Sequence, residues 1–213
     1  MSREGWARYF STMGDPFDDL VAALKALPGL GKRSAERIAV HLLVGDRERL
    51  AGLMRSLEVA GLEIQRCPAC GNLARTGESC AICEDSRRNT QTLCVVEKIQ
   101  DLVAIEAAGG WKGLYHVLHG KLSPLQNRGP EDVNLAGFRE RVQKLGVTEI
   151  LFALSNDMEG EATCHYIVET LLPDTVDIRV TRIGFGLPSG GEVTYADSVT
   201  LRSAMDSRRD FKS

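Results

Sequence analysis

The sequence predicts an α/β protein with a helical N-terminal domain, a four-cysteine segment, a parallel α/β domain and a C-terminal helical tail. Three observations support this: apolar residues recur at helical spacing early in the chain, two Cys-x-x-Cys pairs follow, and short apolar runs then alternate with helical patterns. The boundaries that we expect for these four parts are 1–65, 66–88, 91–188 and 189–213.

Three helices are expected in the first part. Asp15-Pro16 is typical of a helix N-terminus and Pro28-Gly29 of a helix end, with apolar residues at helical spacing between them. A second helix should begin after Gly31, and a third contains the apolar residues between Leu50 and Leu57. Together they form a small helical domain.

The turn between the first two helices has the composition of a helix-hairpin-helix. In Leu27-Pro-Gly-Leu-Gly31 the glycines let backbone approach a phosphate closely, and the next helix offers free N–H groups at its N-terminus. Arg33 and Arg37 share one helix face, and with Lys32 they are predicted to bind DNA through its backbone, independently of base sequence. The alternative is a plain helical turn with a solvated basic face.

The four cysteines have the spacing of a metal site. Nine residues separate the two pairs, and two tight turns that each supply two thiolates match the tetrahedral geometry of zinc. The predicted ligands of this four-cysteine zinc finger are Cys67, Cys70, Cys80 and Cys83. Four protein ligands leave no open coordination position, so the zinc is expected to be structural. The alternatives are a redox pair or two unrelated pairs of buried thiols. Cys94 and Cys164 lie in apolar patterns and are expected to be buried.

Strands and helices alternate in the third part, which implies a parallel sheet with both faces covered. Strands are expected at 92–96, 114–118, 149–154 and 176–183. Helices are expected at 100–108, 131–145 and 161–172, and a last one at 198–208.

Three carboxylates follow strand ends of this sheet. Glu97 follows the first strand, and Glu159 and Glu161 follow the third. Because ligands bind at the carboxyl ends of parallel strands, these residues are candidates for a site that holds Mg²⁺ or a basic partner. The alternative is that the two later glutamates only stabilise the N-terminus of a helix.

The distribution of charge separates the two halves. The whole chain carries a net charge of −3, but the segment 25–66 has eight basic and five acidic side chains, whereas 91–213 has thirteen basic and seventeen acidic ones. A uniformly basic nucleic-acid binder is therefore excluded. No apolar run is long enough for a membrane span or a signal peptide, so a cytoplasmic protein without membrane contact is expected.

The order of these parts resembles that of the bacterial RecR recombination mediators. The resemblance covers about 15–209 and includes the hairpin, the four cysteines and four further motifs. These motifs are Cys94-Val-Val-Glu97, Gly120-Lys-Leu-Ser-Pro-Leu125, Glu159-Gly-Glu-Ala-Thr163 and Thr181-Arg-Ile-Gly184.

The resemblance implies a Toprim domain with Glu97, Glu159 and Glu161 in an acidic crevice, and a hairpin that contacts DNA through Arg33 and Arg37. It also implies a nucleoid-associated clamp, built as a homodimer or tetramer ring through exchanged terminal segments. Such a clamp works with RecO, and with RecF where present, to help load RecA onto single-stranded DNA in DNA repair.

Some positions depart from the family pattern. Leu154-Ser-Asn-Asp157 and Gln126-Asn127-Arg128 differ from the loops that are usual in the family at these places. The gap between the cysteine pairs is one residue longer than usual, and the tail before Met13 has no counterpart.

Two other functions are compatible with parts of the chain. Toprim folds also occur in Mg²⁺-dependent nucleases and topoisomerases, but Tyr115, Tyr166 and Tyr195 lack the setting of a nucleophile. A zinc-ribbon adaptor that binds only protein would use the acidic half. The sequence favours a mediator that is not an enzyme.

Overall fold

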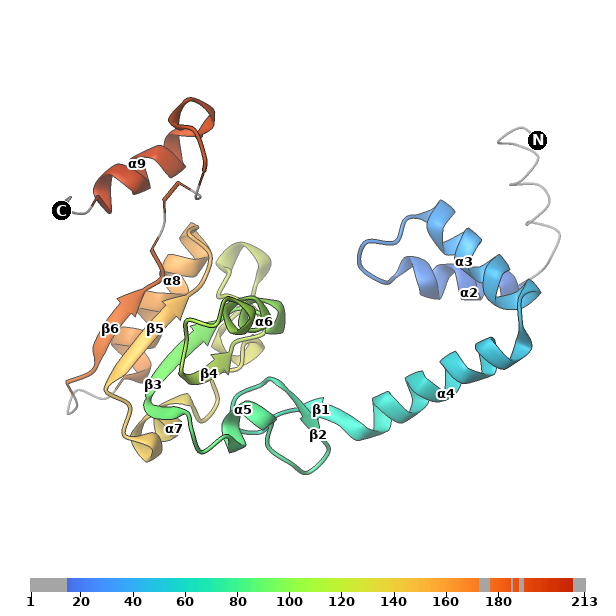
Figure 1. The fold of residues 1–213 in the computed structure, drawn as a ribbon, viewed down its shortest axis with the longest axis horizontal. Coiled ribbons are helices and arrows are strands. Elements are labelled where there is room, and N and C mark those ends of the chain that lie inside the picture. Colours follow the sequence, from blue (N-terminus) through green and yellow to red (C-terminus); the bar gives the residue numbers. More distant parts are fainter. Residues whose placement is uncertain (1–14, 173–176, 185, 188–189, 209–213) are drawn as a thin grey trace. The chain divides into compact units, whose positions relative to one another are not determined.

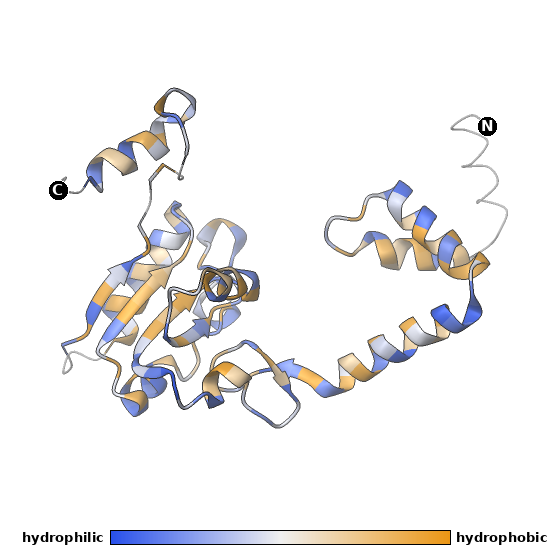
Figure 2. Cartoon of the chain, viewed as in Figure 1, coloured by the Kyte–Doolittle hydropathy of each residue, from blue (hydrophilic) through white to orange (hydrophobic). Residues whose placement is uncertain are grey.

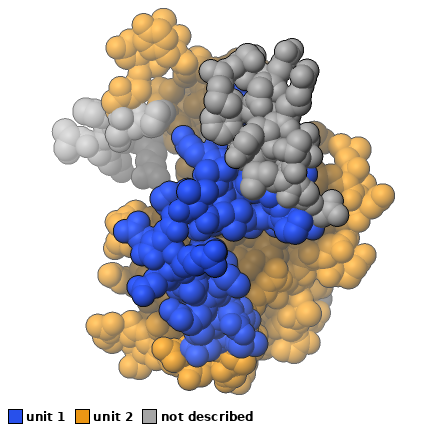
Figure 3. Space-filling model, turned by 90° about the vertical axis from the view of Figure 1, so that its right-hand side faces the viewer, with its two compact units in different colours: residues 1–63 blue, residues 64–213 orange. Residues whose placement is uncertain are grey.

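The computed structural model describes residues 15–172, 177–184, 186–187 and 190–208. The chain divides into two compact units, Met1–Glu63 and Ile64–Ser213 (Figures 1 and 3). The tail before Met13, and residue 176 at the start of the expected last strand, lie outside the described residues.

In the described part of the first unit, residues 15–63 form three helices, as the sequence predicts. They are α2 Asp15–Lys25, α3 Lys32–Val44 and α4 Arg47–Glu63. Phe17 and Val21 of α2 pack against Ala35 and Ala39 of α3, and all four side chains are buried. The small alanines let the two helices approach closely. By contrast, α4 buries none of its side chains and exposes several apolar ones.

A short antiparallel hairpin and one helical turn form the four-cysteine segment. These elements are β1 Ile64–Arg66, β2 Leu73–Arg75 and α5 Ala81–Glu84. Three of the cysteines and Ala74 make up its buried core, with Ile82 partly buried beside them. So few apolar side chains cannot hold a segment folded without a cross-link or a metal ion.

A four-stranded parallel sheet forms the centre of the second unit, which confirms the predicted fold class. In the order β4-β3-β5-β6 its strands are Gly113–Val117, Asn89–Val96, Glu149–Ala153 and Arg179–Arg182 (Figure 1). Val96 lies beside Val117 on one side and Ala153 on the other. The carboxyl ends of three strands are therefore level, and the loops that follow them meet at one edge.

Helices cover both faces of this sheet because successive strand residues point to opposite sides. Leu93 and Val95 face α7 Phe138–Leu145 and α8 Met158–Tyr166. Cys94 and Val96 face α6 Ile99–Ala108. The central strand β5 and the second half of β3 are accordingly hydrophobic, whereas β6 carries an arginine at each end (Figure 2). Cys94 and Cys164 are buried as expected, and burial raises the pKa of their thiols to about 12 and about 11.

Three predicted elements were wrong in extent. The helix expected at 131–145 begins only at Phe138, because Val133 and Leu135 enter the core from an irregular segment after a single turn, η2 Pro130–Asp132. The helix expected at 161–172 begins at Met158 and continues as a π-helix, η3 Ile167–Leu171. The last strand is shorter than expected and consists of Arg179–Arg182.

The C-terminal segment contains η4 Val193–Tyr195 and α9 Ser198–Asp206, close to the helix predicted at 198–208. The side chain of Asp197 caps α9 by accepting hydrogen bonds from the backbone of Val199 and Thr200. Among the described residues, no helix is long and apolar enough to span a membrane.

A partly buried ion pair joins the residue before β3 to helix α6. Arg88 forms a two-point contact with Glu106, and the Tyr115 hydroxyl donates a hydrogen bond of 2.6 Å to the same carboxylate. The Tyr115 ring is fully buried, and burial raises the pKa of its hydroxyl well above the ordinary value. This setting opposes a role for Tyr115 as a nucleophile.

Glu106→Gln is expected to destabilise the second unit by about 2 kcal/mol, since charged hydrogen bonds are lost. The hydrogen bonds from Arg88 lower the pKa of Glu106 below its ordinary 4.5. The contribution of the carboxylate is therefore present above pH 4.5 and is lost as the pH falls through the lowered pKa. Urea unfolding of wild type and Glu106→Gln across pH tests this. The exposed Glu140→Gln is the control, and an equal effect there contradicts the prediction.

Candidate metal centre and carboxylate crevice

Four cysteine thiols converge beside the edge of the sheet. Cys67 directly follows β1, Cys70 lies in the turn before β2, and Cys80 and Cys83 lie at the cap and inside the short helix α5. Their sulfur atoms all lie within 4.8 Å of one another. In the part of the chain that the structure describes, this is the only group of three or more His, Cys, Asp or Glu able to hold a metal ion.

The surroundings of the sulfur atoms suit thiolate ligands. The backbone N–H of Asn72 donates to Cys70 Sγ at 3.4 Å, and that of Cys80 donates to Cys67 Sγ at 3.3 Å. Hydrogen bonds of this kind stabilise charge on metal-bound sulfur. The pKa of Cys70 is raised, first by its hydrogen bond with Cys80, then by that with Cys83 and by burial. Four thiolates this close would repel one another without a cation between them. Zinc fits this group because structural zinc sites are tetrahedral and can be completed by four sulfur ligands.

The four-cysteine segment is attached to β4, the edge strand. The backbone N–H of Val117 donates to the Cys70 carbonyl at 2.8 Å, and His119 Nε2 lies 2.7 Å from the Gly71 carbonyl. Arg141 of α7 reaches both parts, because it donates to the Tyr115 carbonyl at 2.8 Å and lies 3.8 Å from Cys83 Sγ. The four-cysteine segment thereby covers the β4 edge of the sheet, which would otherwise expose unpaired backbone groups.

His116 is a structural residue in this region. Its Nε2 lies 2.6 Å from the Asn134 carbonyl, so this nitrogen donates, and Nδ1 accepts from Arg141 at 3.0 Å. Burial lowers the pKa of His116 to about 4. The ring is therefore neutral and connects the irregular segment before α7 to β4.

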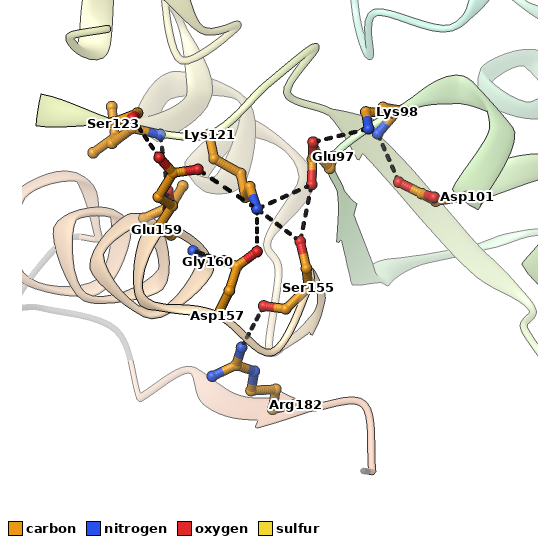
Figure 4. A network of polar contacts seen from close by, with 12 residues as sticks. Glu97, Lys98, Asp101, Lys121, Ser123, Ser155, Asp157, Glu159, Gly160 and Arg182 are labelled. Atoms are coloured by element: carbon orange, nitrogen blue, oxygen red, sulfur yellow. Dashed lines mark hydrogen bonds and ion pairs between the residues drawn. The ribbon is translucent and has the colours of Figure 1, made fainter. Parts of the chain in front are cut away.

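At the carboxyl edge of the sheet, one lysine lies among three carboxylates (Figure 4). The Nζ atom of Lys121 lies 3.8 Å from Glu97 and 3.8 Å from Glu159, and it donates a short hydrogen bond to Asp157. Ser155 completes the group: it accepts from Lys121 at 2.9 Å and donates to Glu97 at 3.1 Å. The loops after β3, β4 and β5 and the first turn of α8 supply these residues. We call this group the carboxylate crevice.

The loop after β4 is fixed to α8, and this positions Lys121. Ser123 is buried and donates its hydroxyl hydrogen bond to Glu159, while the Leu122 N–H donates to Thr163 Oγ1 at 3.0 Å. Gly160 permits the close approach of α8 to the preceding loop, because a Cβ there would collide with the Ser155 carbonyl oxygen.

The structure brings together two of the three predicted crevice residues. Glu97 and Glu159 both contact Lys121, but Glu161 forms an ion pair with Arg182 of β6. The arrangement does not fit Mg²⁺, which needs oxygen ligands at about 2.0–2.1 Å in an octahedron. The lysine nitrogen lies where those oxygens would have to converge, and its positive charge repels a second cation.

Sequence reasoning missed three members of the crevice, namely Asp157, Lys121 and Ser155. Asp157 is the N-cap of α8, where its side chain accepts from the Gly160 N–H, and a cap signature before a helix could have indicated it. Lys121 lies 36 residues earlier, and nothing in the local sequence shows that its side chain meets these carboxylates.

The predicted DNA-contacting residues lie on the first two turns of α3. Gly29 has φ of 80°, a left-handed conformation that favours glycine, and the helix begins after Gly31 without a side-chain cap or an acidic residue in its first turn. Lys32 is paired with Glu36 at 3.8 Å. Arg33 and Arg37 are exposed, and no ion pair within the described residues involves either of them.

Three known protein families match successive parts of the chain. Residues 91–183 match the Toprim domain family, residues 17–60 match the family described as RecR, helix-hairpin-helix, and residues 186–209 match that described as RecR, C-terminal. The fold and the sites thus define a Toprim protein with a helix-hairpin-helix unit and four cysteines placed to hold a metal ion.

Relatives that match nearly the whole chain identify the family within this class of proteins. Recombination protein RecR of Desulforudis audaxviator is 42% identical over 90% of this chain and 95% of its own length. The protein of the same name from Myxococcus xanthus is 42% identical over 92% of this chain and 98% of its own length. That from Clavibacter michiganensis subsp. michiganensis is 43% identical over 90% of this chain and 94% of its own length. The chain belongs to the RecR family of recombination proteins, which supports a role in recombination repair.

Proposed function

We propose that this protein is a DNA-binding recombination mediator that acts as a clamp. With RecO, and with RecF where present, it helps to load RecA onto single-stranded DNA. The observation that supports DNA contact best is the exposed pair Arg33 and Arg37 behind the glycine turn, at an uncapped helix N-terminus. Such a surface attracts phosphate without reading bases.

Zinc is the metal that we assign to the four cysteines. Its role is structural, because four sulfur ligands complete the tetrahedron and leave no position for water or substrate. The cluster lies beside the strand edge and outside the carboxylate crevice. The role that we propose for this metal is therefore to stabilise the four-cysteine segment, and not to take part in catalysis.

Assembly into a dimer or tetramer ring would bury apolar surface that a single chain exposes. Met54, Leu57 and Leu62 of α4 have exposed fractions of 61%, 65% and 72%. Exposed apolar side chains of this size along one helix are typical of an interface. A ring would also add avidity to weak contacts with DNA.

The carboxylate crevice is the proposed docking site for a basic surface of RecO. Three carboxylates and one ammonium leave the group negative, and Asp157 and Glu159 have side-chain exposures of 46% and 34%. A negative and partly exposed group steers and orients a positively charged partner.

Glu159→Lys is expected to weaken the complex with RecO by roughly tenfold or more and to leave affinity for bare DNA unchanged or higher. Surface plasmon resonance with RecO and anisotropy with DNA measure the two effects. Glu169→Lys, at an exposed glutamate of the same domain, is the matched control. Loss of DNA affinity with intact RecO binding would instead identify the crevice as a DNA site.

A Mg²⁺-dependent nuclease is the alternative that the Toprim domain raises. The deciding experiment is a fluorescence anisotropy titration of labelled single-stranded and duplex DNA with and without Mg²⁺, followed by a denaturing gel. Salt-sensitive binding to intact DNA supports the mediator. Cleavage that requires Mg²⁺ and is lost in Glu97→Gln would replace the mediator with the nuclease, and absence of binding without RecO would favour a protein adaptor.

A further inference from the structure

Lys121 is enclosed by the carboxylate crevice. Its side chain has an exposed fraction of 12%, and that of Glu97 has 14%. Figure 4 shows the lysine reaching into the centre of the group, with Glu97, Asp157, Glu159 and Ser155 around its nitrogen. An ionised lysine at this depth requires paired charges and hydrogen bonds, and the crevice supplies both.

The lysine is held in its charged form. Burial lowers its pKa, but the hydrogen bond to Asp157 and the charges of Glu97, Asp157 and Glu159 outweigh this effect and leave the pKa raised. The same hydrogen bond lowers the pKa of Asp157. Lys121 is thus a charged ammonium that is hydrogen-bonded to Asp157 and lies 3.8 Å from both Glu97 and Glu159.

We propose that the ammonium of Lys121 takes the place of a divalent cation between these carboxylates and makes the crevice independent of metal. A group of acidic side chains at the carboxyl ends of parallel strands can hold Mg²⁺ through its oxygen atoms. Here the lysine contacts all three carboxylates at once, and the fourth acidic residue nearby, Glu161, is paired with Arg182. The inference concerns the metal requirement of the crevice and is independent of the identity of its partner.

Lys121 also determines the shape of the site. It joins the loop after β4 to the loops after β3 and β5, through contacts with Glu97 on one side and Asp157 on the other. A metal ion in the same position would join the same three loops. Lys121 is therefore a positioning residue, and its removal is expected to leave a negative cavity that attracts the missing cation.

The test is a Mn²⁺ titration of the zinc-loaded full chain, followed by electron paramagnetic resonance. Wild type is expected to show no saturable site in the crevice, and Lys121→Met is expected to gain one that binds Mn²⁺ at least tenfold more tightly. Lys98→Met is the matched control, because Lys98 also contacts Glu97, at 3.3 Å, but is 62% exposed and lies outside the crevice. It should behave as wild type.

Thermal unfolding provides a second readout. Added Mg²⁺ should leave the melting temperature of wild type and of Lys121→Arg unchanged, and it should raise that of Lys121→Met, since a cation that binds only the native state stabilises it. If Lys121→Met does not fold, the wild-type protein alone can still test the proposal by NMR. The proposal is overturned if Mn²⁺ broadens the amide signals of Ser155 and Gly160 in wild type and this broadening is lost in Glu97→Gln. Equal Mn²⁺ affinities of wild type and Lys121→Met would also overturn it.

Discussion

Cys80→Ser is expected to remove the metal, unfold the four-cysteine segment and lower the stability of the adjoining sheet. Structural zinc contributes about 10–16 kcal/mol to folding in zinc-finger peptides, so loss of one thiolate has a large effect. The segment has little else to hold it together, because its buried core consists of Ala74 and the cysteines themselves. No apolar cluster replaces the missing cross-link.

The effect should extend into the second unit through β4. Val117, His119 and Arg141 each contact the four-cysteine segment, and at about 1 kcal/mol for each contact the sheet loses about 3 kcal/mol. For a unit of this size that corresponds to a fall in melting temperature of about 6–12 °C. Amide exchange at Val117 should accelerate, because its N–H no longer has the Cys70 carbonyl as a partner.

Elemental analysis, calorimetry and hydrogen exchange together test this prediction. Wild type should contain one zinc per chain and Cys80→Ser should contain none. Cys164→Ala removes a buried thiol that lies outside the cluster, so it should keep its zinc. If Cys80→Ser retains both the metal and the stability of wild type, the four-cysteine assignment is wrong.

The double variant Arg33→Ala/Arg37→Ala is expected to lose most of its affinity for DNA without losing stability. Each phosphate contact contributes about 0.7–0.9 to the slope of log K against log salt, so two lost contacts reduce the slope by about 1.4–1.8 and the affinity by roughly 10- to 100-fold at about 0.1 M salt. Both side chains are exposed, and alanine is a better helix former than arginine. The helical unit should therefore keep its fold.

Fluorescence anisotropy over a range of salt concentrations measures both quantities. Arg47→Ala/Arg49→Ala removes the same charge from exposed positions at the start of α4, and it should reduce affinity much less. An equal loss in the two double variants would mean that only diffuse charge attracts DNA. Unchanged affinity in Arg33→Ala/Arg37→Ala would place the DNA contact elsewhere.

Local patterns in the sequence were enough to predict most elements and the metal centre. Helical spacing, the glycine turn before Arg33 and the spacing of the four cysteines are short-range features, and backbone geometry converts them directly into structure. The alternating strands and helices were sufficient to predict a parallel sheet with both faces covered. The predicted helix at 131–145 was wrong in its first half because burial of Val133 and Leu135 outweighed helical periodicity.

The composition of the carboxylate crevice depended on contacts between distant segments. Three loops meet there because parallel pairing aligns the ends of β3, β4 and β5, and only this alignment brings Lys121 to Glu97 and Asp157 while Arg182 pairs with Glu161. Residue order along the chain shows that acidic side chains follow strand ends. Which charge lies between them is decided by side-chain packing in three dimensions, and here the ammonium of Lys121 lies between the three carboxylates.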